Sequence, residues 1–174
     1  MKGAGNLEHI AELSLSLGRA YGLRGRDLED LRLCATFHDV GKVTVPGSIL
    51  LKPGPLTEGE WVLMRRHTWH GAHILQAGQV SAQASLVALT HHEKWDGSGY
   101  PFGLHSGFIP LFSRIVSIAD VYDALVSKRS YKPAFSRRES LCILCSQRKK
   151  SFDPLLLDLF VALLSTLPAE STMH

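Results

Sequence analysis

Apolar residues recur at helical spacing along most of this chain, and this periodicity is the strongest constraint on its fold. Between Leu7 and Tyr21 they return every three or four residues, which is the pattern of a helix that packs one face against a core. Gly22 suits the end of that helix. A second helix with the same spacing is predicted from about Asp27 towards His38.

Helix-start signals predict further helices downstream. Thr57 with Glu60 forms a capping-box pattern. Ser136 with Glu139 repeats it, and Asp153 is an N-cap residue followed by proline.

Glycine and proline mark the interruptions in this pattern. The segments 41–56 and 95–110 are rich in both residues and are predicted to be loops, whereas the apolar segments 81–90 and 111–126 are predicted to be helices. The sequence therefore predicts an all-α fold.

Length and charge narrow the class of protein. The 174 residues fit one domain, and a net charge of +3 is too small for a typical DNA- or RNA-binding protein. The longest apolar run, 155–164, is half a membrane span and includes Asp158, so we expect a core helix and no membrane span.

The three cysteines, in a chain without a secretory leader, predict a reducing compartment, and we expect the cytoplasm. Cys142 and Cys145 form a single CxxC pair without a second pair, which favours core cysteines over a metal or redox site.

Several of the nine histidines stand beside acidic residues or at predicted helix ends. Asp120 lies inside an apolar helix, where burial is costly unless a metal ion, an ion pair or a capping bond compensates its charge. Taken singly, each residue is better explained by a structural role. Together, imidazoles and carboxylates suit iron, manganese or zinc, and a carboxylate such as Asp39 can bridge two ions that polarise a phosphoryl oxygen.

Four strings in order along the chain carry a resemblance. They are HDVGK (38–42), HTWHGAHIL (67–75), HHEKWDGSGYP (91–101) and SIADVYDALVSKRSYK (117–132). The chain resembles the HD-GYP family, the cyclic di-GMP phosphodiesterase branch of the HD phosphohydrolase superfamily. The match covers nearly the whole chain, so residues 1–174 are interpreted as a single HD-GYP domain.

The resemblance implies a bundle of about seven to eight helices with a glycine-rich GYP loop, and a centre of two divalent ions, iron or manganese. Asp39 would bridge the ions; His38 and Asp120 would serve one, and His67, His91 and His92 the other. Asp39 and Lys42 are implied to be catalytic. The implied substrate contacts are Lys42, Tyr100, Asp123, Arg129 and Lys132.

The implied function is hydrolysis of cyclic di-GMP to linear pGpG, GMP or both, with the GYP loop also available to signalling proteins. One position departs from the family, because its first ligand histidine falls at Asn6, and an amide is a poorer ligand for a transition metal. His9, three residues later, could compensate. Three alternatives stay open: a centre with one weak ion, a mononuclear remnant, or a protein that binds cyclic di-GMP or a partner without turnover. Another cyclic dinucleotide as substrate is a further alternative.

Overall fold

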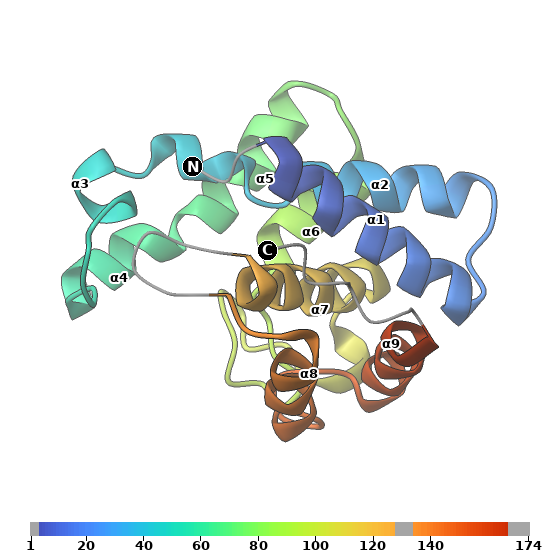
Figure 1. The fold of residues 1–174 in the computed structure, drawn as a ribbon. Helices are drawn as coiled ribbons and strands as arrows, with labels where there is room; N and C mark the ends of the chain where they lie inside the picture. The colour runs from blue at the N-terminus through green and yellow to red at the C-terminus, as the bar shows by residue number, and fades with distance from the viewer. Residues whose placement is uncertain (1–3, 128–133, 167–174) are drawn as a thin grey trace.

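Helix α7 (Leu111–Val126) is the central element of the fold (Figure 1). The computed structural model describes residues 4–127 and 134–166. In it, α7 contacts α1 (Ala4–Tyr21), α2 (Arg26–Phe37), α6 (Ala82–Thr90), α8 (Arg137–Ser146) and α9 (Pro154–Thr166). The remaining helices are η1 (Val40–Thr44), α3 (Gly47–Leu50), α4 (Glu58–Arg65), α5 (His67–Ala77) and η2 (Ser106–Phe108). No strand occurs among the described residues, so the all-α prediction is confirmed.

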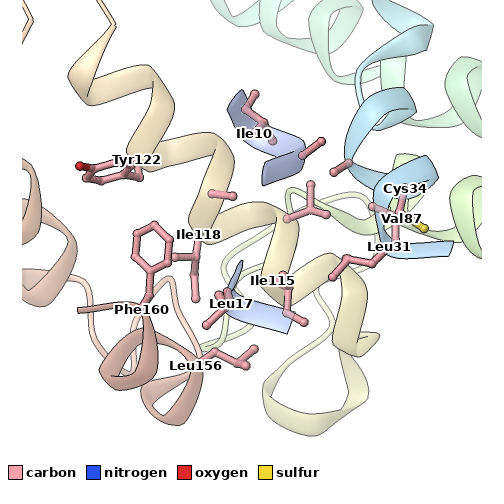
Figure 2. Packing of buried hydrophobic residues seen from close by; sticks show 14 of the residues in the cluster. Ile10, Leu17, Leu31, Cys34, Val87, Ile115, Ile118, Tyr122, Leu156 and Phe160 are labelled. Carbon is pink, nitrogen blue, oxygen red and sulfur yellow. The ribbon is translucent and has the colours of Figure 1, made fainter. Parts of the chain in front are cut away.

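The core forms where the apolar faces of these helices meet α7 (Figure 2). Ile115 and Ile118 of α7 are fully buried, together with Leu31 of α2 and Leu156 of α9. The predicted core helix 155–164 thus corresponds to α9. Within the described residues, the helices are too short or too polar to cross a bilayer.

The capping signals act as the sequence predicts. The Thr57 hydroxyl accepts from the backbone N–H of Glu60 at 3.3 Å, while the Glu60 carboxylate accepts from the Thr57 N–H at 2.7 Å. Ser136 and Glu139 make the same reciprocal pair at the start of α8. The segment 41–56 differs from its prediction as a loop, because η1 lies in it and α3 starts directly after Pro46.

The prediction that Cys142 and Cys145 are core residues is wrong, since both are exposed. Helix α8 buries Ser140 and Leu144 instead. Cys34, on α2, is fully buried.

Helices α3 and α4 extend away from the centre of the bundle (Figure 1). Helix α4 buries none of its residues and leaves Trp61, Val62 and Leu63 exposed. Helix α4 ends at Arg65, and α5 begins two residues later at His67.

Candidate metal centre

The residues predicted to bind metal come together from helix ends and from the middle of α7. Within residues 4–127 and 134–166, two groups of ligand atoms form, each with all of its atoms within 4.8 Å of one another. The first group is Asp39, His67, His91 and His92; the second is His38, Asp39 and Asp120. Asp39 belongs to both groups, as expected of a bridging carboxylate.

Glycine allows η1 to approach α5 closely enough for this convergence. A Cβ at Gly41 would lie 1.9 Å from the carbonyl oxygen of His67 and 2.5 Å from the backbone nitrogen of Gly71. Only glycine fits such an approach of two backbones. The glycine of the HDVGK string therefore sets the position of Asp39 against His67.

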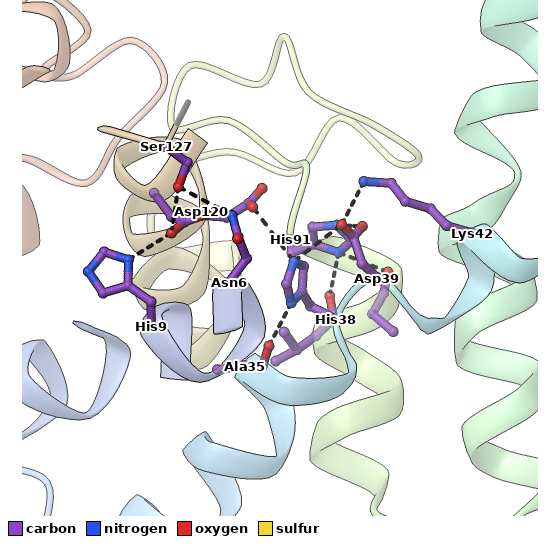
Figure 3. A network of polar contacts seen from close by, with 12 residues as sticks. Asn6, His9, Ala35, His38, Asp39, Lys42, His91, Asp120 and Ser127 are labelled. Carbon is purple, nitrogen blue, oxygen red and sulfur yellow. Dashed lines mark hydrogen bonds and ion pairs between the residues drawn. The ribbon is translucent and has the colours of Figure 1, made fainter. Parts of the chain in front are cut away.

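Backbone carbonyls orient three of the imidazoles (Figure 3 shows two of them). His38 Nδ1 lies 2.7 Å from the Ala35 carbonyl, His67 Nδ1 2.7 Å from that of Met64, and His91 Nδ1 3.0 Å from that of Ala88. A carbonyl oxygen only accepts, so each Nδ1 must donate a proton. In the neutral ring, Nε2 then keeps its lone pair, and this is how proteins orient metal-binding histidines.

The three Nε2 atoms surround the carboxylate of Asp39. His38 Nε2 lies 3.4 Å from Oδ2, and the Nε2 atoms of His67 and His91 each lie 3.5 Å from Oδ1. Burial opposes ionisation of Asp39, but the contacts of His38 and His91, with the charge of Lys42, hold its pKa well below the usual range. Asp39 is therefore a carboxylate at neutral pH.

The imidazoles divide into two electrostatic environments. Burial disfavours the charged form of His38, yet contacts with Asp120, 3.7 Å away, and with Asp39 raise its pKa to about 9, so a metal ion bound by His38 would displace the Nε2 proton. Burial and the neighbouring charge of His91 lower the pKa of His67 to about 4. The same two causes, in the same order, hold the pKa of His92 well below its ordinary value. His67 and His92 are thus neutral at pH 7, as metal ligation requires.

Buried polar atoms in this cluster fit a metal ion. The Nε2 atoms of His67 and His91 have no hydrogen-bond partner within the described residues. Leaving such atoms unsatisfied costs free energy, and a divalent cation would satisfy both while compensating the charge of Asp39. The donor set of imidazoles and carboxylates suits iron, manganese or zinc.

Lys42 stands beside this cluster, as the sequence predicts. Its Nζ donates to Asp39 Oδ2 at 2.6 Å and its side chain remains partly exposed (Figure 3). The cation therefore lies where the carboxylate meets the surface.

The GYP loop, which is the segment 95–110 with Gly99, Tyr100 and Pro101, lies beside the cluster on the side of His92. The rings of Tyr100 and His92 are stacked, with centroids 4.8 Å apart and planes inclined by 29°. Burial and then the charge of Asp39 raise the pKa of the Tyr100 hydroxyl, so it stays protonated and can donate a hydrogen bond. Gly99 allows the turn, because a Cβ there would lie 2.4 Å from the backbone nitrogen of Lys94.

Asp123, a predicted substrate contact, is buried and bonded to helix α1. The side-chain amide of Asn6 donates to Asp123 Oδ2 at 3.0 Å and to the Ser127 hydroxyl at 3.2 Å. His9 Nδ1 lies 2.7 Å from Asp123 Oδ1. The substrate role of Asp123 stays a prediction. Arg129 and Lys132 lie outside the described residues.

Two residues near the cluster were not assigned roles from the sequence. Glu93 is buried, and its two carboxylate oxygens accept from the backbone N–H groups of Phe102 and Leu104. Arg65 lies over the ring of Tyr100. The position of Glu93 directly after two predicted ligands was an available signal, whereas nothing in the sequence connected Arg65 with Tyr100.

The amino-acid sequence of this chain is similar to those of known proteins. A family model described as an HD domain matches residues 2–156. A cyclic di-GMP phosphodiesterase response regulator from Xanthomonas campestris is 42% identical over 154 residues, which are 87% of this chain and 41% of that protein. A 3′3′-cGAMP-specific phosphodiesterase from Vibrio cholerae is 39% identical over 172 residues, 94% of this chain and 33% of that protein. The chain thus spans less than half the length of these relatives.

Solved structures agree on the fold. An HDG"Y"P protein from Bdellovibrio bacteriovorus superimposes with a TM-score of 0.74 at 19% identity, over 92% of this chain and 51% of that chain. A cyclic GMP-AMP-specific phosphodiesterase from V. cholerae gives a TM-score of 0.72 at 19% identity, over 96% of this chain and 46% of that chain.

Proposed function

Because this chain belongs to the HD domain family, we propose that its cluster of imidazoles and carboxylates is the metal centre of a cyclic di-GMP phosphodiesterase. The observation that carries this proposal is the orientation of His38, His67 and His91 by backbone carbonyls, with their Nε2 atoms around Asp39. The names of the relatives support the substrate class.

Two divalent ions, iron or manganese, are proposed for the centre. Asp39 would bridge them, His38 and Asp120 would hold one, and His67, His91 and His92 would hold the other. When bound, such ions supply Lewis-acid activation of water and of a phosphoryl oxygen.

The reaction adds water across one phosphodiester of the ring. A water oxygen bonds to phosphorus, the bond to the ribose 3′ oxygen breaks, and that oxygen leaves as a hydroxyl after gaining a proton. The product is linear pGpG, and a second hydrolysis would give GMP. In this scheme Lys42 would hold a phosphate beside Asp39, and Tyr100 would donate from the loop. Arg129 and Lys132 would add positive charge.

A second function remains as a proposal, because the Asn6 amide nitrogen is engaged by Asp123 and Ser127. Asparagine carries no imidazole, so position 6 adds no such ligand to His38 and Asp120. In this alternative the protein binds cyclic di-GMP without turnover, or binds a partner protein through the GYP loop, where Phe102 and Phe108 are exposed.

The test is to purify the protein without oxygen, count metal ions per chain, and follow cyclic di-GMP and 3′3′-cGAMP by chromatography with iron or manganese. We expect linear product from cyclic di-GMP, and loss of both metal and product in Asp39→Ala. Asp27→Ala, an exposed acid on α2, is the matched control.

The outcomes separate the alternatives. Nucleotide binding without product under both metals would favour the binding protein. If 3′3′-cGAMP disappears faster than cyclic di-GMP, the proposed substrate is 3′3′-cGAMP. Turnover that survives Asp39→Ala would contradict the metal mechanism.

A further inference from the structure

Arg65 contacts two aromatic rings at the border of the proposed metal centre. Its guanidinium carbon is 5.1 Å from the ring centroid of Tyr100 and 6.0 Å from that of Trp61. Tyr100 also stacks on His92, one of the proposed metal ligands. Trp61 is 44% exposed. The series His92, Tyr100, Arg65 and Trp61 therefore extends from the buried imidazoles to the surface.

The charge of Arg65 has no acidic partner within the described part of the chain. Its guanidinium makes no hydrogen bond or ion pair there, whereas Lys42 pairs with Asp39 and Arg114 with Asp153. Contact with an aromatic ring uses no N–H donor of a guanidinium when the two planes stack, so the donors stay available for other partners.

We propose that Arg65 binds a phosphate of the cyclic dinucleotide, and this inference rests on the proposed function. The ring of such a substrate carries two phosphodiesters, and only one is attacked at a time. The other remains an anion and needs a cation close to the metal centre. A guanidinium matches phosphate oxygens with two parallel hydrogen bonds, and Arg65 is presented by Tyr100 at that border.

Arg65 could instead have a purely structural role, as a solvated cation at the C-terminal end of α4, where the helix dipole favours positive charge. Arg66, the next residue, provides the matched control, because it is also exposed and at the same helix end. Arg66 makes no cation–π contact among the described residues.

The experiment measures KM and kcat for cyclic di-GMP in Arg65→Ala, Arg65→Lys and Arg66→Ala, with bis(p-nitrophenyl) phosphate as a second substrate. This compound has one phosphodiester and no second phosphate. Hydrogen bonds to charged groups are worth about 1.5–3 kcal/mol, so we expect KM to rise about tenfold or more in Arg65→Ala, with little change in kcat. Arg65→Lys should lie between wild type and Arg65→Ala, because lysine keeps the charge and loses the paired geometry.

Hydrolysis of bis(p-nitrophenyl) phosphate and metal content should be unchanged in all three variants. Equal effects of Arg65→Ala and Arg66→Ala on KM would overturn the role of Arg65, and so would an equal loss on both substrates. If wild-type protein neither binds nor hydrolyses cyclic di-GMP, the proposed function fails and this inference fails with it. If the wild-type protein binds cyclic di-GMP without hydrolysing it, the same three variants are compared by their Kd for cyclic di-GMP, measured by calorimetry.

Discussion

The carboxylate of Glu93 accepts a hydrogen bond from the backbone N–H of Phe102 over 2.7 Å. Its other oxygen accepts from the N–H of Leu104 at 3.0 Å. Because Glu93 directly follows His92, these two bonds tie the GYP loop to the end of α6 that carries the imidazoles.

Replacing this acid should loosen the loop. Glu93→Gln substitutes an N–H group for one accepting oxygen and leaves a backbone donor unsatisfied, so we expect the free energy of unfolding to fall by about 1–3 kcal/mol. Hydrogen exchange at the amides of Phe102 and Leu104 should accelerate. Glu8→Gln, an exposed acid on α1, should change neither quantity. Unchanged exchange in Glu93→Gln would show that other contacts hold the loop.

Loss of one oriented imidazole should weaken metal binding. His91→Ala removes a buried Nε2 that lies 3.5 Å from Asp39, and we expect metal affinity to fall at least tenfold, since even residues that only orient ligands cost about 10–100-fold. Metal retained after dialysis, measured by mass spectrometry, provides the readout. His73→Ala replaces an exposed histidine of α5 and should retain the wild-type metal content. Equal retention in both variants would place the ion elsewhere.

Asn6→His should increase the metal retained by the chain. The present amide bonds Asp123, one helical turn after Asp120, so an imidazole at the same place on α1 would stand next to the group formed by His38 and Asp120. We expect more ions per chain after dialysis, without requiring a change in turnover. Asn6→Ala separates loss of the amide from gain of a ligand. Metal content that rises equally in Asn6→Ala and Asn6→His would contradict this reasoning.

The thiols should react in two classes. Burial, with the nearby charge of Asp30, raises the pKa of the Cys34 thiol to about 12, so it stays protonated and inert at pH 8. Cys142 and Cys145 are exposed. A thiol reagent such as DTNB should label these two in the native protein and Cys34 only after unfolding. Labelling of Cys34 at a similar rate in the folded protein would show that α2 opens readily.

Local patterns account for what the sequence predicted well. His38 and Asp39 are adjacent, and Thr57 bonds a residue three positions away, so their arrangement follows from short spacing. The resemblance connected the more distant members of the cluster, His67, His91, His92 and Asp120, which the structure brings together.

Contacts between distant segments were not predictable in the same way. The sequence predicts Asn6 as a weak ligand, but its bond to Asp123 joins positions 117 residues apart and depends on how α1 crosses α7. Glu93 bonds backbone groups, which no side-chain pattern encodes. The CxxC spacing fitted both a buried and an exposed face of α8, and Leu144 occupies the buried one.

The convergence of separate helix ends on Asp39 also gives a bound ion a mechanical role. Such an ion would join segments far apart in the chain, as a disulfide does, but a chelator could remove it. A metal ion that binds only the folded state raises the free energy of unfolding, and this gain grows with the concentration of free metal. The melting temperature of this protein should then rise and fall with metal supply, so its lifetime would depend on the same ions as its chemistry.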